Sequence, residues 1–471
     1  MPRPRAALIV AVLLASLALA AAARSNVRPA RVTPTPPATA PEPAAPAVPS
    51  LAADVAPTPM PTVLWLTGDV LLDPAFRRSG AASGEPAETY AFMIAPIARH
   101  WRADGDAATV LVNLESPVAT LRREPDAYLD DAEEIFARTG HRRIPSPLNA
   151  PQSLLDGLVR AGVDAVDLAN NHALDQDRAG LGETLDAARA HGLATVGAGR
   201  SDAEARAPQL YGEEGSRIAL LATFVRDRPE PPWLAANEAR LSVVDERTLD
   251  DVRDAALRSD AVVVVVHVVA ELLSRPTPAT RLFASELVAA GADVVIVHGP
   301  HVIAPVERIE SGGRGGIVAF SIGNFVSDMG KNARPGRHDA PRNQGGDDKW
   351  NDPRTRSGLV VRLSLARGEP IDVAFLPTWM HSDRWLIDQG LARPPVTFTV
   401  EPLAACGPPL ELRAAWPPEG CDAMEAWVAR HRDAALATAG LVSTECARCE
   451  DGAPCRWRGE AHLLRATRPP R

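Results

Sequence analysis

The sequence has no excess of positive charge, no cysteine before residue 406 and no long apolar run after its first 25 residues. The net charge of -9 offers no basic footprint for nucleic acid, so we expect no nucleic-acid partner. Beyond residue 25, no apolar stretch reaches the roughly 20 residues that span a bilayer. Only 4% of the residues are aromatic, yet the 471 residues suffice for a sizeable core and for two or three domains.

The first 25 residues form a targeting segment. Arg3 and Arg5 precede a continuously uncharged, mostly apolar run from Ala6 to Ala23, in which small residues around Ala20 and Ala23 offer cleavage sites. This pattern predicts a secretory signal peptide. The alternative is an uncleaved membrane anchor, because the run approaches the length of a bilayer span. In both cases we expect an exported chain, periplasmic or extracellular, which stays close to the membrane if the segment is retained.

Two further segments flank the expected folded body at 63–384. Residues 26–62 are rich in Pro, Ala, Thr and Val and predict a semi-rigid linker. Residues 385–471 form a C-terminal extension that contains all the cysteines, which are Cys406, Cys421, Cys446, Cys449 and Cys455. In an exported chain these favour disulfides over a zinc site. Because five is odd, one thiol is free or pairs with another chain.

The folded body alternates short apolar runs with segments of helical periodicity, which is typical of an α/β fold. We expect strands at 63–69, 109–115, 163–168, 218–224, 260–267, 292–298 and 316–325, and a hairpin formed by 359–365 and 371–376. We expect helices at 90–101, 153–160, 181–193 and 280–290. The run at 260–267 is almost continuously apolar, as a parallel strand covered on both faces should be. In such sheets, sites lie at the carboxyl ends of the strands.

Five of these strands end in residue types that bind metals. The residues are Asp69, Glu115, Asn171 with His172, His267, and His298 with His301. Each alone is equally compatible with a turn former, a capped loop or a hydrogen-bonded core histidine. Their recurrence at successive strand ends indicates one shared site. Carboxylates, amide oxygens and imidazoles suit Mn²⁺, Fe²⁺ or Zn²⁺. The ligand count predicts two ions with a bridging carboxylate, an arrangement that serves displacement at phosphorus and activates water.

The polar residues also form an ordered series of motifs. The series comprises Gly68-Asp69, Asn113-Leu-Glu-Ser-Pro117, Ala169-Asn-Asn-His-Ala-Leu-Asp175, His267 with Glu271, His298-Gly-Pro-His301 and Ser321-Ile-Gly-Asn-Phe325. Over about residues 63–330, this series resembles the CapA family, the bacterial capsule synthesis (poly-γ-glutamate capsule, PGA_cap) domain related to calcineurin-like metallophosphoesterases. The resemblance implies a metallophosphoesterase-type α/β sandwich of two sheets flanked by helices, with a metal site at one edge.

The resemblance also implies roles for individual residues. It assigns His172 as the catalytic acid. It assigns Asp69, Glu115, Asn171, His267, His298 and His301 as metal ligands. We add Asn170, Glu271 and Asn324 as weaker candidates for substrate binding. Two departures affect these assignments, because Val268-Val269 stands where the family usually has Trp-Gly, and the first motif lacks the Asp-x-His of ordinary phosphoesterases.

Two functions follow as expectations. The first is an exported, metal-dependent, phosphoesterase-like hydrolase of capsule or poly-γ-glutamate-type polymer synthesis, acting on a cell-envelope polymer or phosphoester. The second is a non-catalytic component that binds the polymer or serves its export and assembly with other capsule proteins. The arginine-rich stretch at 334–356 is compatible with binding of an anionic polymer, although charged loops of this kind are usually only solvated. Fold alone does not decide between the two functions.

Overall fold

The computed structural model describes residues 60–72, 84–105, 108–120, 148–226, 239–330, 352–382, 398–402, 434 and 437–440. The expected signal peptide, almost all of the linker, most of the arginine-rich stretch and all five cysteines lie outside the described residues. Within these ranges, no helix combines the length and the apolar character needed to cross a membrane.

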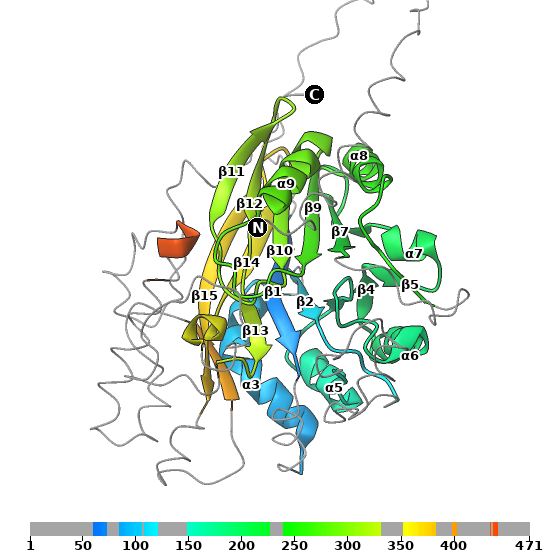
Figure 1. Ribbon diagram of the computed structural model, residues 1–471, viewed down its shortest axis with the longest axis vertical. Coiled ribbons are helices and arrows are strands. Elements are labelled where there is room, and N and C mark those ends of the chain that lie inside the picture. The colour runs from blue at the N-terminus through cyan, green and yellow to red at the C-terminus, as the bar shows by residue number, and fades with distance from the viewer. Residues whose placement is uncertain are drawn as a thin grey trace, which may run out of the picture. The chain divides into compact units, whose positions relative to one another are not determined.

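The first sheet holds eight strands around β1 (Figure 1). Its order is β16 (Phe398–Pro402), β15 (Asp372–Ser382), β14 (Ser357–Leu365), β1 (Thr62–Leu71), β2 (Ala108–Leu114), β3 (Ala165–Asp167) and β4 (Ala194–Val196), and β13 (Asn324–Ser327) also pairs with β1. Strands β13, β1, β2, β3 and β4 run parallel, whereas β14, β15 and β16 form an antiparallel meander. The expected hairpin is confirmed as β14 and β15.

The second sheet holds six strands, with its parallel centre formed by the longest apolar runs. Its order is β11 (Val306–Ser311), β12 (Arg314–Ala319), β10 (Val294–His298), β9 (Ala261–Val268), β7 (Ile218–Val225) and β6 (Gln209–Tyr211). All eight residues of β9 are buried, as the sequence predicts for a strand covered on both faces. The short strands β5 (Ala198–Gly199) and β8 (Arg240–Leu241) form a separate pair.

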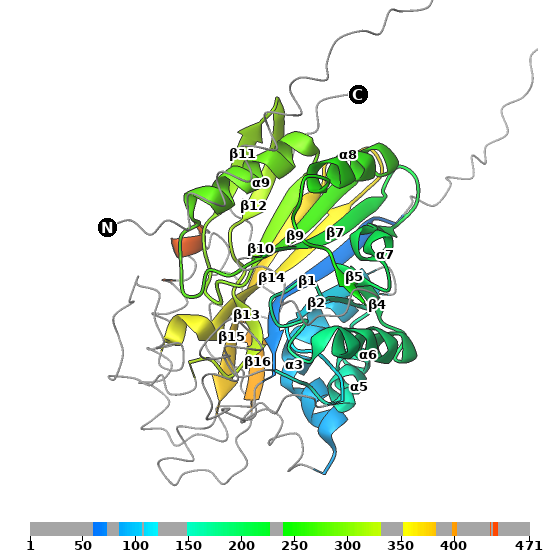
Figure 2. The same ribbon diagram turned by 45° about the vertical axis from the view of Figure 1, so that its right-hand side comes forward.

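Helices flank the two sheets, so the expected mixed α/β fold with two sheets between helices is confirmed (Figure 2). Helices α3 (Pro86–Arg102), α5 (Gln152–Arg160) and α6 (Asp177–Ala190) share a core with one face of β1, which includes Val63 and Trp65. The other face of β1, with Leu64 and Leu66, packs against the second sheet. Helices α8 (Thr248–Arg258) and α9 (Pro278–Ala290) lie on the second sheet, α7 (Asp202–Arg206) lies near β5, and η3 (Pro353–Arg356) precedes β14.

The strand expected at 316–325 is wrong, because the chain there forms two strands in different sheets. Strand β12 ends at Ala319 beside β10, and β13 begins at Asn324 beside β1. Gly323 adopts a φ of 68°, a left-handed backbone that bends the chain between the two sheets.

Strand β16 lies within the segment that was expected as a separate extension, yet it pairs with β15 and so continues the first sheet past residue 384.

Glycines bring β13 unusually close to β1 and β14. A Cβ added at Gly68 would lie 2.1 Å from the carbonyl oxygen of Gly323, and one at Gly358 would lie 2.0 Å from that of Asn324. Only residues without side chains allow this approach. It puts Asn324 in register with Asp69 at the end of β1.

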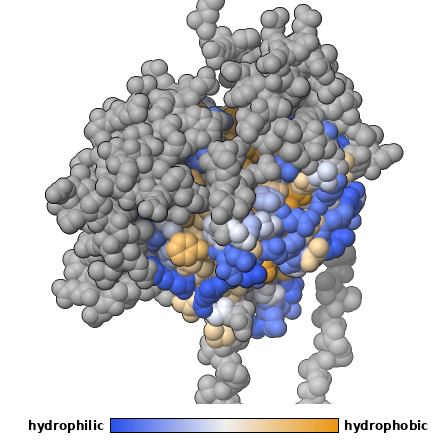
Figure 3. Space-filling view, turned by 90° about the horizontal axis from the view of Figure 1, so that it is seen from below, coloured by the Kyte–Doolittle hydropathy of each residue, from blue (hydrophilic) through white to orange (hydrophobic). Residues whose placement is uncertain are grey.

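The described residues that are visible from below the view of Figure 1 are mainly hydrophilic, with apolar residues scattered among polar ones (Figure 3). Such scattered apolar side chains are ordinary on a folded protein.

Candidate functional site

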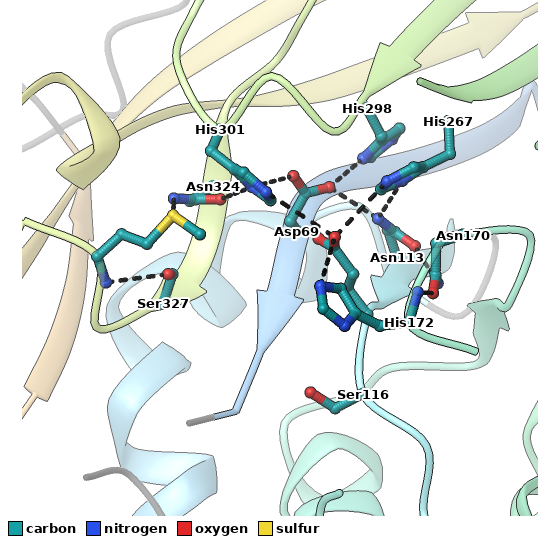
Figure 4. A network of polar contacts seen from close by, with 12 residues as sticks. Asp69, Asn113, Ser116, Asn170, His172, His267, His298, His301, Asn324 and Ser327 are labelled. Atoms are coloured by element: carbon teal, nitrogen blue, oxygen red, sulfur yellow. Dashed lines mark hydrogen bonds and ion pairs between the residues drawn. The ribbon is translucent and has the colours of Figure 1, made fainter. Parts of the chain in front are cut away.

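Two rows of polar side chains meet where the strands of both sheets end (Figure 4). In the first sheet, Asn113 pairs in register with Asp69 on one side and with Asp167 on the other. In the second sheet, His267 pairs with His298. Neighbours in register on parallel strands project from the same face, so each row presents its side chains together. The rows come into contact, because Nδ1 of His298 lies 2.8 Å from Oδ1 of Asp69.

Asp69 stands at the centre of the first row and is fully buried. Its Oδ1 accepts a hydrogen bond from the amide of Asn113 at 2.7 Å in addition to the contact with His298. Its Oδ2 lies 3.0 Å from Nδ1 of His301. Burial opposes its charge, but the bonds to His298 and His301 outweigh burial and hold the pKa of Asp69 well below its usual value. Asp69 is therefore ionised.

Glu115 is the least satisfied carboxylate of the site. Both of its oxygens are fully buried, and neither has a hydrogen-bond partner among the described residues. Three imidazoles point Nε2 at its Oε1: His267 at 3.6 Å, His301 at 3.9 Å and His172 at 4.0 Å. Burial and the charge of Asp69 raise the pKa of Glu115 to about 8. A buried carboxylate that accepts no hydrogen bonds is costly unless a cation neutralises it.

The surroundings shift the pKa values of His267 and His301 in opposite directions. Burial lowers the pKa of His267 to about 3, so its imidazole is neutral and able to ligate a metal. Burial also opposes a charge on His301, but Glu115 and Asp69 outweigh it and raise the pKa of His301 to about 9. His301 has a φ of 59°, which is uncommon for a residue other than glycine. Such strained backbones are found where a site requires a particular side-chain direction.

His172 approaches the cluster from the loop after β3. Its Nδ1 lies 2.7 Å from Oδ2 of Asp175, so this nitrogen carries a proton and Nε2 faces Glu115. Burial lowers the pKa of His172, but the charge and hydrogen bond of Asp175 outweigh it, so the pKa is raised overall. His172 can therefore hold a proton at the edge of the cluster, as a general acid must.

The donor set fits a divalent cation. Ligand atoms of Asp69, Glu115 and His267 all lie within 4.8 Å of one another, and all three side chains are buried. Two carboxylates and one imidazole suit Mn²⁺, Fe²⁺ or Zn²⁺. The oxygens of Glu115 indicate the fit directly, because they accept no hydrogen bond among the described residues and a bound cation would supply the interaction that they lack. His298 and His301 adjoin this set through Asp69.

The remaining predicted residues occupy different surroundings. Asn171, predicted as a ligand, has a buried Oδ1 without a hydrogen-bond partner among the described residues. Asn170 binds protein groups: its amide donates to Oδ1 of Asn113 and to the Leu114 carbonyl, each at 3.0 Å. Glu271 is exposed after β9, and its charge acts on Glu115 and His301. The roles assigned to these residues from the sequence stay predictions.

The sequence reasoning assigned no role to Asn113 or Asp175, although the structure joins both to the cluster. Asn113 bonds Asp69 and lies 3.5 Å from Nδ1 of His267, and Asp175 orients His172. Both residues belong to motifs that the sequence displays, and Asp175 lies three residues after His172. That spacing was the signal that could have identified Asp175.

Access to the cluster is restricted. The side chain of His172 is 17% exposed, whereas those of Asp69, Glu115, His267, His298 and His301 are at most 3% exposed. Val269, which follows the site strand β9, is 41% exposed. Of these six side chains, His172 is therefore the one that is most accessible to solvent.

Fold and site together define a two-sheet α/β protein with a buried cluster of carboxylates and histidines suited to a divalent cation. The profile of the family described as "Bacterial capsule synthesis protein PGA_cap" matches residues 63–329, more than half of the chain. The chain belongs to this family, as the motif series predicts.

Individual relatives match shorter parts of the chain. A capsule biosynthesis protein CapA of Bacillus anthracis is 30% identical over 39% of this chain and 44% of its own length. A probable polyglutamine synthesis accessory protein of Mycobacterium tuberculosis is 28% identical over 50% of this chain and 62% of its own length. The match thus spans about half the length of these relatives. A solved structure of a hypothetical protein from Thermus thermophilus covers 67% of this chain and 98% of its own, at 16% identity and a TM-score of 0.37.

Proposed function

We propose that the chain is an exported, metal-dependent hydrolase of the phosphoesterase type that acts in the synthesis of a capsule or poly-γ-glutamate-type polymer. One observation carries the proposal of a metal centre. Glu115 is fully buried, neither of its oxygens accepts a hydrogen bond among the described residues, and three imidazole Nε2 atoms face its Oε1 within 4.0 Å. Such a carboxylate favours a cation as its natural partner. The two-sheet architecture with its site at the strand ends is compatible with a calcineurin-like metallophosphoesterase sandwich.

Asp69, Glu115 and His267 would hold the first ion, and His298, His301 and Asn171 are the candidates for a second. When bound, such ions supply Lewis acidity at a phosphoryl oxygen and lower the pKa of water. We propose Mn²⁺, Fe²⁺ or Zn²⁺, because the donors are oxygen and nitrogen atoms.

The chain's own contribution to the reaction is proton transfer by His172. Its Nδ1 proton is held by Asp175 at 2.7 Å, which leaves Nε2 directed at the cluster. When the oxygen of water bonds to phosphorus and the P–O bond to the leaving group breaks, protonated Nε2 can donate its proton to the oxygen of that leaving group. Because Asp175 and Glu115 raise the pKa of His172, the imidazole retains its proton to higher pH than a free histidine would. The buried surroundings also exclude bulk water and strengthen these interactions.

We include in this proposal where the chain is located and which partners it has. The apolar segment at residues 6–23 supports export, either with cleavage or with retention as an anchor. The relatives named for capsule biosynthesis and for polyglutamine synthesis support work beside a polymer-forming machinery. The substrate would be a phosphoester or an envelope polymer, and proteins of capsule assembly would be its neighbours.

A second candidate function rests on the burial of the cluster. Five of its side chains are at most 3% exposed, and Val268-Val269 replaces the Trp-Gly expected beside the site. A closed metal site without an open position is typical of a structural role. In that case the chain would be a non-catalytic component that binds the polymer or serves its export and assembly.

Metal content and turnover separate the two functions. The full-length chain would be purified, its metals measured by elemental analysis, and hydrolysis of an aryl phosphodiester followed with and without Mn²⁺. The same assays would be run on His172→Ala and His267→Ala. His191→Ala is the matched control, because His191 bonds Ala187 at the far end of α6 and pairs with Asp156.

The hydrolase predicts bound metal and Mn²⁺-dependent turnover in the wild type and in His191→Ala. It predicts that His172→Ala loses turnover but keeps its metal, whereas His267→Ala loses both. Bound metal without turnover would support the assembly or binding role. Absence of bound metal in the wild type would refute the metal centre.

A further inference from the structure

Asn324 is a buried amide whose polar atoms all bind protein groups. Its Oδ1 lies 2.9 Å from Nδ1 of His301, and its Nδ2 donates to the Thr355 carbonyl at 2.9 Å and contacts the sulfur of Met329 at 3.8 Å (Figure 4). The side chain is 4% exposed. An amide that is enclosed and fully engaged in this way has no free group for a substrate, which argues against the substrate-binding role expected from the sequence.

These partners determine which way the amide of Asn324 points. The Thr355 carbonyl can only accept a hydrogen bond, so it must face Nδ2, and Oδ1 must face His301. Oδ1 also only accepts, so Nδ1 of His301 is the donor. The second group near Nδ1 is Oδ2 of Asp69 at 3.0 Å, which accepts no hydrogen bond among the described residues but favours a proton on Nδ1 through its negative charge. Both neighbours therefore keep the proton on Nδ1 and leave Nε2, which faces Glu115 at 3.9 Å, as the coordinating nitrogen.

We propose that Asn324 is a positioning residue that holds His301 with Nδ1 protonated and Nε2 directed into the metal cluster. The inference rests on the metal centre of the proposed function and goes beyond it, because it assigns the coordinating atom of His301 and the group that selects it. Metal-bound histidines commonly donate their second ring nitrogen to an acceptor of this kind.

The backbone around Asn324 supports this role. Gly68 and Gly358 admit β13 so closely that any side chain at either position would collide with Gly323 or Asn324. Asp69 also donates its backbone N–H to the Gly323 carbonyl at 3.3 Å. Asn324 is thus fixed to the same strand end that carries Asp69, and the amide and the carboxylate reach Nδ1 of His301 from rigid neighbouring strands.

The test is a double-mutant cycle on metal affinity. Mn²⁺ alone would be titrated calorimetrically into the metal-stripped, full-length chain and into Asn324→Ala, His301→Ala and the double variant. Asn324→Asp keeps an oxygen acceptor toward Nδ1. Asn149→Ala is the matched control, because Asn149 is also a buried amide, 5% exposed, but it bonds only the backbone of Ala119 in the described structure.

We expect Asn324→Ala to weaken Mn²⁺ binding by about 10- to 100-fold, the usual effect of removing a group that orients a ligand. Asn324→Asp should recover most of this loss, and Asn149→Ala should bind as the wild type does. If Asn324 acts through His301, the double variant should bind no more weakly than His301→Ala alone.

Wild-type affinity in Asn324→Ala, an equal loss in Asn149→Ala, or additive losses in the double variant would each overturn the proposal. The hydrolase proposal would be refuted by a different result from the one that refutes the role of Asn324. A wild type that binds Mn²⁺ without hydrolysing the aryl phosphodiester would refute the hydrolase, while the affinity cycle would still decide the role of Asn324.

Discussion

Asp175 lies 2.7 Å from Nδ1 of His172, and this contact turns the other nitrogen of His172 toward the buried Glu115. The two residues come from one loop, yet together they prepare a proton donor for a site built by strands of two sheets. Asp175 therefore determines which nitrogen of His172 carries the proton, and it helps to raise the pKa of His172.

Replacing Asp175 by Asn should reduce turnover of an aryl phosphodiester by at least about tenfold, because a misoriented or unprotonated acid loses its contribution. Loss of the negative charge should also lower the pKa of His172. The basic limb of the kcat/KM profile against pH should therefore move to lower pH. The control is Asp156→Asn, because the exposed Asp156 makes a similar contact, 3.2 Å from Nε2 of the half-buried His191. An unchanged pH profile in Asp175→Asn would contradict the assignment.

Glu115 makes the metal-free protein sensitive to pH. Its pKa is raised from 4.5 to about 8, so the folded chain keeps a proton that the unfolded chain releases above 4.5. The free energy of unfolding should therefore fall as pH rises from about 4.5 to about 8. Glu115→Gln should flatten this dependence, because it removes the titrating group and also the charge that raises the pKa of His301. Urea unfolding with a chelator present, at several pH values, measures the difference. Parallel curves for both proteins would refute the prediction.

Metal binding should stabilise the fold by mass action. A ligand present at 100 times its Kd adds about 2.7 kcal/mol to the free energy of unfolding. Mn²⁺ should accordingly raise the Tm of the stripped wild type, and a chelator should reverse the rise. His267→Ala should show little of this shift, since His267 belongs to the set of atoms within 4.8 Å. His191→Ala should respond as the wild type does. An equal shift in His267→Ala would place the metal elsewhere.

Gly299 should be intolerant of a side chain for two separate reasons. Its φ is 98°, and a Cβ there would lie 2.0 Å from the Val268 carbonyl and 2.9 Å from Nε2 of His267. Gly299→Ala should destabilise the chain by more than about 1 kcal/mol and weaken Mn²⁺ binding by displacing His267. Gly313→Ala is the control, because Gly313 has a φ of 77° but nothing within 4 Å of an added Cβ. Gly313→Ala therefore tests the effect of backbone strain without a collision. If Gly299→Ala and Gly313→Ala changed the Mn²⁺ affinity equally, the proposed collision with His267 would be contradicted.

Much of the fold is visible in the periodicity of the sequence, because burial along one element depends on local spacing. The apolar run at 260–267 predicts the buried strand β9, and the alternating segments after residue 358 predict the pair β14 and β15. The run at 316–325 misled this reasoning. Its residues are buried throughout, and burial does not reveal that Ala319 and Asn324 belong to different sheets.

For the candidate site, too, one part can be predicted from the sequence and another part depends on the tertiary structure. The sequence by itself determined which residue types stand at the strand ends, because an acidic or histidine side chain directly after a buried strand is costly without a partner. That reasoning found Asp69, Glu115 and His267, which the structure brings together.

Only the tertiary structure decided which atoms meet. The amide of Asn170 turns inward to Asn113, and that of Asn324 turns to His301, although both residues carry the same functional group as Asn171. These directions depend on register between strands and on close backbone contacts such as that between Gly68 and Gly323. Register and backbone approach arise from packing between distant segments, so no local pattern in the sequence encodes them.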